Sequence, residues 1–310
     1  MNINRIKAIC KRWTGQFFYF SPVIAFGDFI TTIFFRYSNS KIKYTINKMY
    51  YEKAKDIIYL RYNNIIEKWI KKEGITDNLI DEKSNIFIFW WQGINNAPKI
   101  IKGCINTIYE NSGLHKVVIL DKTNWNGYIQ LPEYVLEKME KNIINFTQFS
   151  DILRFFLLYK YGGIWIDPTC LITNNLSQEI YRYKFYTIRH GDAWEHPICK
   201  GLWCTFFMAA GKGNYIMGYM KDLLLAYWKK EKSEVVYLLP DTFLAIGYEY
   251  IPYIKQIIED IPMNNEHRDD FRKLLIKSHG KNFDGLLKNV DKSTYIHKLT
   301  YKMYIEKFDE

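Results

Sequence analysis

Two carboxylates and one arginine lie close together in the segment SDILRFFLLYKYGGIWIDPTCLI, residues 150–172. Asp151 and Arg154 are three residues apart, so on a helix they share a face. The stretch around them is apolar on nearly all sides, and a charged pair on a buried helix is unfavourable unless its charges are paired or bind a polar ligand. Asp167 follows a short apolar run, where a carboxylate can hold a divalent cation against a diphosphate. The spacing indicates a site for a charged ligand, with a salt bridge that only caps the helix as the alternative.

The same segment predicts the elements that position these residues. Ser150 is a favourable N-cap residue, so we expect a helix over residues 151–161. Gly162 is typical of the residue that ends a helix. Residues 163–166 then form a short strand, so Asp167 stands at the end of a strand that follows a glycine pair.

A strand–helix–strand unit precedes this segment. Residues 86–91 (IFIFWW) form a continuous apolar run, which is typical of a buried parallel strand. A helix is expected from Pro98 to about residue 110, and residues 116–120 (KVVIL) predict a second buried strand. The sequence therefore indicates an α/β fold with a parallel sheet.

The ends of these two strands carry the next candidate residues. In open α/β sheets, ligands bind beyond the carboxyl ends of the strands. Trp90, Gln92 and Asp121 are therefore expected at a ligand-binding edge. Either Trp90 or Trp91 can stack on a nucleobase, and the other belongs to the core because neighbours on a strand face opposite sides.

The last third of the chain adds candidates with weaker signals. Residues 202–210 predict a buried strand and residues 214–228 an amphipathic helix. Pro240-Asp241-Thr242 opens a further helix, for which Asp241 is either a simple cap or a functional acid. Residues 294–302 (TYIHKLTYK) contain His297, which is either structural or a ligand, beside Lys298.

The pattern SDxxRxxxLyxyGGxwxD, together with the IFIFWWQG opening and the HKLT close, resembles the DXD region of GT-A glycosyltransferases. The closest likeness is to the capsular polysaccharide synthesis proteins, which are similar to α-mannosyl- and α-galactosyl-type transferases and, more distantly, to large glucosylating toxins. The resemblance covers about residues 86–302. It implies a GT-A fold over residues 81–310, Rossmann-like, with a mostly parallel sheet flanked by helices.

The resemblance also implies roles for individual residues. Asp151 and Arg154 would contact the donor sugar, and Asp241 would face sugar hydroxyls in the acceptor cleft. A divalent Mn²⁺ or Mg²⁺ ion would be bound by Asp167, Thr169 and His297, although Thr169 replaces the second DXD carboxylate and a hydroxyl is a poorer ligand. The remaining nucleotide-sugar contacts would come from Trp90, Gln92, Asp121, Gly162, Gly163 and Lys298.

The implied reaction is transfer of a hexose-type sugar from a nucleotide donor, UDP by analogy. The acceptor would be a growing capsular or cell-surface glycan, or a lipid-linked oligosaccharide, and the anomeric configuration would be retained. No residue stands out as a covalent nucleophile, so front-face attack is the expected route. Because Thr169 departs from the DXD pattern, a non-catalytic scaffold of the envelope polysaccharide machinery is the alternative.

Charge is unevenly distributed along the 310 residues. Of the net charge of +10, residues 1–80 carry 14 Lys and Arg against 6 Asp and Glu, a net of +8. Residues 1–80 are also helical in pattern, and we expect them to form a basic, aromatic arm. Because this charge lies away from the strand–helix–strand region and no RNA-binding motif is present, nucleic acid is not the expected partner.

The segment from Phe17 to Phe35 is apolar enough to contact a membrane. Its 19 residues could just span a bilayer, but Asp28 and Pro22 interrupt them. Two short helices lying in the membrane surface fit better, with an ordinary buried helix pair as the other alternative. Five cysteines without a CxxC motif indicate a reducing compartment. The expected location is therefore the cytoplasm, with peripheral association at the inner face of the cell membrane.

Overall fold

The computed structural model describes residues 3–35, 40–192, 194 and 197–308. Its centre is a five-stranded sheet in the order β2-β1-β3-β6-β5. β1 pairs in parallel with β2 and with β3, whereas β6 runs antiparallel to β3 and β5. Four strands therefore point the same way and β6 opposes them, which confirms the expected α/β fold with a mostly parallel sheet. The strands are β1 (Asn85–Phe89), β2 (Lys116–Leu120), β3 (Gly163–Ile166), β5 (Phe185–Thr187) and β6 (Phe207–Ala210).

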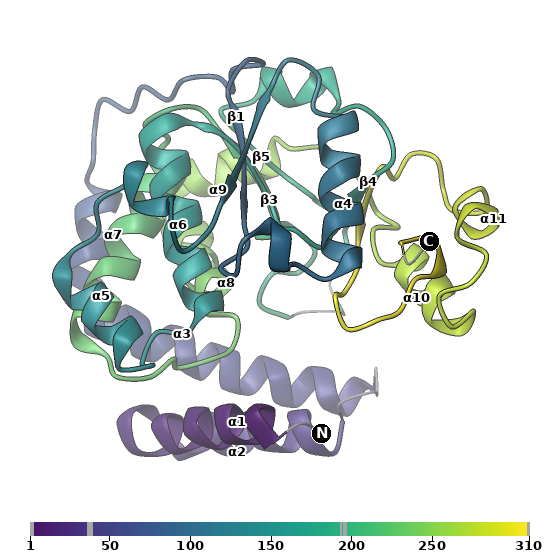
Figure 1. Cartoon of the computed structure of the whole chain (residues 1–310). Coiled ribbons are helices and arrows are strands. Elements are labelled where there is room, and N and C mark those ends of the chain that lie inside the picture. The colour runs from purple at the N-terminus through teal and green to yellow at the C-terminus, as the bar shows by residue number, and fades with distance from the viewer. Residues whose placement is uncertain (1–2, 36–39, 193, 195–196, 309–310) are drawn as a thin grey trace.

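β1, which lies between β2 and β3 in the sheet, separates two crossovers that run in opposite directions. α4 (Lys99–Glu110) leads from β1 to β2, and α6 (Phe146–Tyr161) leads into β3 on the other side. Because such crossovers are right-handed, the two helices lie on opposite faces of the sheet (Figure 1). The carboxyl end of β1 is therefore a topological switch point, where open α/β sheets form their ligand crevice.

Further helices surround this sheet. α7 packs against α6, and α8 packs against both α7 and α9. A two-stranded sheet pairs β4 (Cys170–Ile172) with β7 (Ile296–Lys298), which returns the C-terminal region to the turn after β3. The other helices of the described C-terminal part are α5 (Glu133–Glu140), α7 (Tyr215–Lys230), α8 (Leu239–Tyr250), α9 (Pro252–Glu259), α10 (Asp270–Lys277) and α11 (Phe283–Leu287).

The N-terminal region is helical up to residue 70. It consists of α1 (Ile3–Gly15), a π-helical turn (Gln16–Phe20), α2 (Pro22–Ile33) and the long α3 (Lys41–Ile70). α1 and α2 lie below the rest of the molecule in Figure 1, and α3 packs against α7 and α8. Residues 71–80 are not helical, so the expectation of a fully helical segment to residue 80 is wrong for its last ten residues. The division into domains at residue 80 stays a prediction.

Three element boundaries differ from those expected. α6 begins at Phe146, because Asn145 and Gln148 form a capping box one turn before Ser150. The strand expected over residues 86–91 ends at Phe89, and that expected over 202–210 is confined to Phe207–Ala210. In both cases the extra apolar residues lie in turns and loops, where they pack against the core without pairing in the sheet.

Candidate functional site

Asp167 is the centre of a partly buried cluster of charges. Lys298 Nζ donates to one carboxylate oxygen at 2.7 Å. The other oxygen accepts from Trp165 Nε1 at 2.9 Å and from Arg154 Nη2 at 3.3 Å. Arg154 also donates through Nη1 to Asp151, at 2.9 Å. The structure thus brings together the four predicted residues Asp151, Arg154, Asp167 and Lys298, and it adds Trp165 of β3 to them.

Each element supplies its residue for a local reason. The apolar face of α6 holds Arg154 against β3, where its guanidinium lies 5.1 Å from the Trp165 ring centre. Asp167 directly follows β3, and its backbone N–H is held by the carbonyl of Phe206 at 2.9 Å. The register of β4 with β7 places Lys298 opposite Cys170, three residues after Asp167.

The charges in this cluster stabilise one another. Burial by itself would raise the pKa of Asp167, but Lys298 and Arg154 outweigh it and hold this pKa below its ordinary value. Burial would likewise lower the pKa of Lys298, yet the negative charge of Asp167 raises it. Asp167 and Lys298 are therefore an ion pair at neutral pH.

Asp151 differs from Asp167 in its protonation. Burial raises the pKa of Asp151 to about 7, opposed by Arg154 and reinforced by the negative charges of Asp167, Asp241 and Glu234. At neutral pH this carboxyl group can either donate or accept a proton. Such behaviour suits a group that hydrogen-bonds sugar hydroxyls.

Asp241 lies in the first turn of α8 but does not act as a helix cap. Its side chain is 5% exposed and accepts from Trp203 Nε1 at 3.1 Å and from Cys199 Sγ at 3.2 Å. The residue at the N-cap position is Leu238. The interpretation of Asp241 as a simple cap is therefore wrong, and its charge is near enough to Asp151 to affect the pKa of that residue.

The carboxyl ends of β1 and β2 carry the predicted edge residues. Phe89 pairs with Leu120, so Trp90 and Asp121 follow side by side. Trp91 stacks on Phe146 within an aromatic cluster, whereas the Trp90 ring lies 5.8 Å from the ring of Tyr301. Trp90 is accordingly the residue that faces the C-terminal segment near Lys298.

Two predicted edge residues are engaged in tight loops. Gln92 is exposed, and its backbone carbonyl accepts from Asn96 Nδ2. Asp121 accepts from the N–H and the hydroxyl of Thr123, and the hydroxyl bond is the main reason that the pKa of Asp121 is lowered. The Asp121 carboxylate also lies so close to Gly93 (φ +79°) that a Cβ there would be 3.2 Å from its Oδ2.

Gly162 and Gly163 lie at the opposite end of β3 from Asp167. Both have positive φ, +69° and +102°. A Cβ on Gly163 would lie 2.3 Å from the carbonyl oxygen of Asn85, and one on Gly162 would lie 2.7 Å from the backbone nitrogen of Lys212. The glycine pair therefore allows β3 to pack closely at its start and lies away from the ligand-binding edge, so the geometry does not support the nucleotide contact expected of it.

The expected metal ligands do not converge. His297 neighbours Lys298 on β7, so its side chain faces the other side of the strand from the one that reaches Asp167. It is fully buried beside Phe271, and burial lowers its pKa to about 4. Thr169 lies in the turn after Asp167, where its carbonyl accepts from the N–H of Leu299.

The donor set around Asp167 does not fit a divalent cation. Both carboxylate oxygens already bind cationic donors, and among the described residues no group of three His, Cys, Asp or Glu side chains could hold a metal ion. A metal ion at Asp167 would have to displace Lys298 or lie against its positive charge. The Mn²⁺ or Mg²⁺ ion stays a prediction, which this arrangement of donors does not support.

The family model for capsular polysaccharide synthesis proteins matches residues 32–310. The chain belongs to this family. The resemblance inferred from the motifs is thereby confirmed over most of the sequence. Among solved structures, the PaToxG glycosyltransferase is similar, with 19% identity over 87% of this chain and 94% of that chain and a TM-score of 0.41. A search of curated proteins gives no match.

Three residues that contact the site, Trp165, Phe206 and Tyr301, were not predicted from the sequence. Trp165 is two residues before Asp167, so on a strand both side chains face the same side, and this spacing could have identified it. Phe206, whose ring lies 4.6 Å from Lys298 Nζ, and Tyr301 gave no comparable signal. Their contacts depend on long-range packing of the chain.

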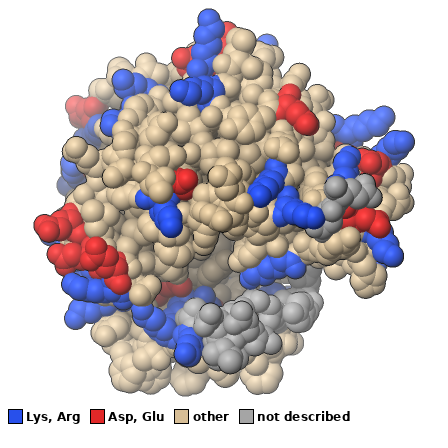
Figure 2. Space-filling view, viewed as in Figure 1, with Lys and Arg blue, Asp and Glu red and all other residues tan. Residues whose placement is uncertain are grey.

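The surface is hollowed between the sheet and the N-terminal helices, as Figure 2 shows. The carboxyl ends of the strands face these helices in Figure 1. Burial raises the pKa of Tyr51 in α3, and the charges of Asp28 and Asp241 raise it further, which indicates that the two regions are close. A separate pocket of about 370 Å³, lined by residues that include Asn106, Thr107 and Phe283, contains none of the predicted site residues.

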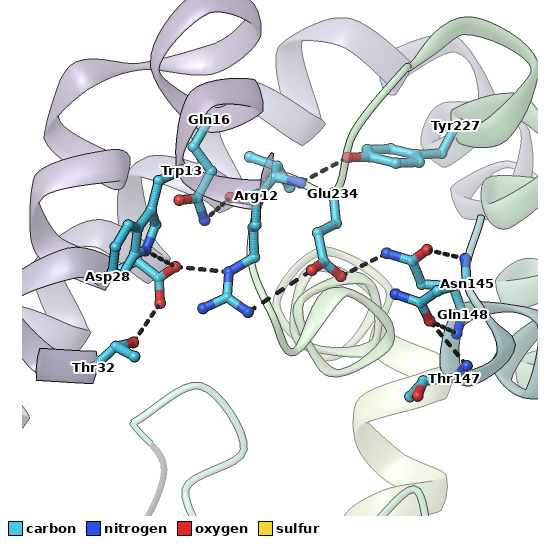
Figure 3. A network of polar contacts seen from close by, with 11 residues as sticks. Arg12, Trp13, Gln16, Asp28, Thr32, Asn145, Thr147, Gln148, Tyr227 and Glu234 are labelled. Carbon is cyan, nitrogen blue, oxygen red and sulfur yellow. Dashed lines mark hydrogen bonds and ion pairs between the residues drawn. The ribbon is translucent and has the colours of Figure 1, made fainter. Parts of the chain in front are cut away.

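A polar network joins the N-terminal helices to α6 (Figure 3). Arg12 Nε donates to Asp28 at 2.7 Å, and its Nη1 lies 3.9 Å from Glu234. Glu234 accepts from Gln148, which belongs to the capping box of α6. The helix that carries Asp151 and Arg154 is thus fixed at its start to the segment between α7 and α8 and, through it, to α1.

Proposed function

We propose that this protein transfers a hexose-type sugar from a nucleotide donor, UDP in the first instance, to a growing capsular or cell-surface glycan. The observation that carries the proposal is the cluster of Asp151, Arg154, Asp167 and Lys298 at the switch point of an α/β sheet. Membership of the capsular polysaccharide synthesis family supports it.

The residues suggest a division of tasks. Trp90 and Tyr301 offer aromatic faces to the base, and Arg154 and Lys298 offer positive charge to the diphosphate. Asp151, which can exchange a proton at neutral pH, suits the sugar hydroxyls, and Asp241 supports it from α8. In this proposal, these residues together form one binding site for the nucleotide sugar.

The reaction would proceed with retention by front-face attack. The bond between the anomeric carbon and the diphosphate oxygen breaks, and its electron pair stays on the diphosphate. The acceptor hydroxyl oxygen forms the new bond to the anomeric carbon, and its proton passes to the departing diphosphate. Preorganised positive charge at the leaving group is the main catalytic tool for such a step.

The N-terminal helices are suited to hold this site at a membrane surface. Between residues 14 and 35 the one charged residue is Asp28, and its side chain is buried on Arg12 and Trp13. α1 and α2 form an N-terminal hairpin, and its exposed residues between positions 17 and 35 are instead apolar; they include Phe17, Phe18, Tyr19, Val23, Phe26, Phe29, Ile33 and Phe34. Among the described residues no helix is long and apolar enough to cross a membrane. We therefore include docking on an anionic membrane, at its cytoplasmic face, in the proposal, with a lipid-linked glycan as acceptor.

A donor screen tests the activity. The full chain is incubated with UDP-, GDP- and CMP-sugars, and nucleotide release is measured with and without capsular acceptor extracts. Release from one donor class in wild type, lost in Asp167→Ala, supports the proposal. If no donor is turned over or bound, the protein is a non-catalytic scaffold of the polysaccharide machinery, the alternative that Thr169 leaves open.

Liposome co-sedimentation tests the docking. Wild type should sediment with anionic vesicles at low salt, and a variant with Ser at Phe18, Phe26 and Phe34 should remain in the supernatant. A matched control carries Ser at Leu114, Ile276 and Tyr304, which are also exposed and apolar but lie outside the N-terminal helices. Equal sedimentation of the two variants would show that the hairpin is not the docking surface.

A further inference from the structure

Lys298 binds Asp167 at the carboxylate oxygen where a metal ion would bind if Asp167 were a metal ligand. Its ammonium group lies 2.7 Å from Asp167 Oδ2, and its side chain is still 20% exposed. The side chain is therefore held by Asp167 and yet partly exposed to solvent. In this respect it differs from a salt bridge that is sealed inside the core.

The backbone fixes Lys298 in place. Its N–H donates to the carbonyl of Arg268 at 2.8 Å, and the next N–H, of Leu299, donates to Thr169 at 2.9 Å. The β4–β7 pairing adds the register between Cys170 and Lys298. The backbone around the lysine is thus held by the segment before α10 on one side and by the turn that follows β3 on the other, which makes its charge preorganised.

Arg154 supplies a second positive charge with unused hydrogen-bonding capacity. Its side chain is 5% exposed, and Nε has no hydrogen-bond partner among the described residues. Asp167 thereby gathers two cations on one carboxylate, at 2.7 and 3.3 Å. The anionic diphosphate of a nucleotide sugar would be attracted to these two cations, whereas a divalent metal ion would be repelled by them.

We propose that Lys298 takes the place of the divalent cation, so that this protein binds a nucleoside diphosphate and transfers the sugar without a metal ion. The inference rests on the proposed function. Asp167 then serves as the anchor that orients Lys298 and Arg154, and not as a metal ligand. When the anomeric C–O bond breaks, the negative charge that develops on the departing diphosphate is met by the two side chains, and neither of them gives up its proton.

The experiment measures UDP binding to the full chain by isothermal titration, once with EDTA and once with Mn²⁺. The expected result is the same dissociation constant within about twofold in both buffers. Lys298→Gln, which keeps a polar side chain one atom shorter and removes its charge, should weaken UDP binding by about 30-fold, as for the loss of one charge-assisted hydrogen bond. Uridine, which has no phosphate, should bind the variant and wild type equally.

A matched control and two outcomes decide the matter. Lys292→Gln removes an exposed lysine from the loop before β7 and should leave UDP binding unchanged. If wild type binds UDP only with Mn²⁺, or if Lys298→Gln binds UDP as tightly as wild type, the metal-free role of Lys298 is wrong while the transferase function stands. If neither UDP nor GDP binds in either buffer, the proposed function itself is wrong, and the role of Lys298 with it.

Discussion

Asp28 in the N-terminal hairpin and Asp167 at the sheet edge bind partners of the same kind in different settings. Asp28 accepts from Arg12 at 2.7 Å, from the indole N–H of Trp13 at 2.9 Å and from the hydroxyl of Thr32 at 3.3 Å. Its side chain is 5% exposed. The negative charge of Asp28 is thus balanced by the one positive charge of Arg12, and its other two donors are neutral.

Asp167 has an arginine and an indole as well, Arg154 and Trp165, but its third donor is the ammonium group of Lys298. Its side chain is 24% exposed. Arg154 and Lys298 therefore bring more positive charge than Asp167 alone can balance, and Asp151, whose pKa is about 7, balances the remainder only in part at neutral pH. The comparison teaches that a closed, balanced ion pair stabilises the fold, whereas an open, unbalanced one is available to a ligand.

The largest expected effect is a loss of activity on removal of the Asp167 carboxylate, which removal of the Asp28 carboxylate should not cause. Asp167→Ala should lower kcat/KM for sugar transfer by about 1000-fold, because Arg154 and Lys298 lose the group that orients them. The measurement is the rate of nucleotide release at donor concentrations well below KM, with circular dichroism to verify folding. Turnover at the wild-type rate would remove Asp167 from the site.

The converse experiment uses Asp28. Asp28→Ala leaves Arg12 buried beside Trp13 without its acceptor, so the free energy of unfolding should fall by about 3 kcal/mol. Transfer per folded molecule should change less than threefold. Urea unfolding measures the first quantity, and a selective loss of turnover without a loss of stability would contradict the contrast drawn here.

Glu234 lies between Arg12 of α1 and Gln148 of α6, and it should make the free energy of unfolding depend on pH. Burial raises its pKa from the ordinary 4.5 to about 7, against the effect of Arg12 and Gln148. Between these values the folded protein holds a proton that the unfolded chain has released. The free energy of unfolding should therefore fall as pH rises from about 5 to 7, by on the order of 2 kcal/mol, and level off above.

Unfolding in urea at pH 5 and pH 7.5 measures this slope. Glu234→Gln should flatten it in part, and the remainder should belong to Asp151, whose pKa is raised in the same direction. Asp151→Asn is therefore the companion variant. Identical slopes for wild type and Glu234→Gln would show that the carboxyl group of Glu234 is ionised alike in the folded and unfolded states.

The smallest effect concerns the pair on α6. Asp151 and Arg154 share a hydrogen bond, so the double variant Asp151→Asn/Arg154→Lys should lose less transition-state stabilisation than the two single variants together, by about 1 kcal/mol. A double-mutant cycle on kcat/KM measures this. Strict additivity in kcat/KM, with non-additivity only in the melting temperature, would identify the pair as a structural salt bridge.

Features that depend on residues close together in the sequence could be predicted from the sequence. The apolar runs of β1 and β2 predicted the βαβ unit, and the glycine pair with the apolar run after it predicted a buried helix followed by a strand that ends at Asp167. The start of α6 was also readable, since Asn145 and Gln148 have the spacing of a capping box, but the prediction placed it at Ser150.

The tertiary structure alone decided which distant groups meet. Lys298 binds Asp167 across 131 residues because β7 pairs with β4 in one particular register, and a shift by one residue would have turned His297 toward the site instead. The burial of Asp28 likewise depends on Arg12 and Trp13 of another helix. Residue types and local periodicity do not specify such long-range pairings, because these are selected by the packing of the whole core.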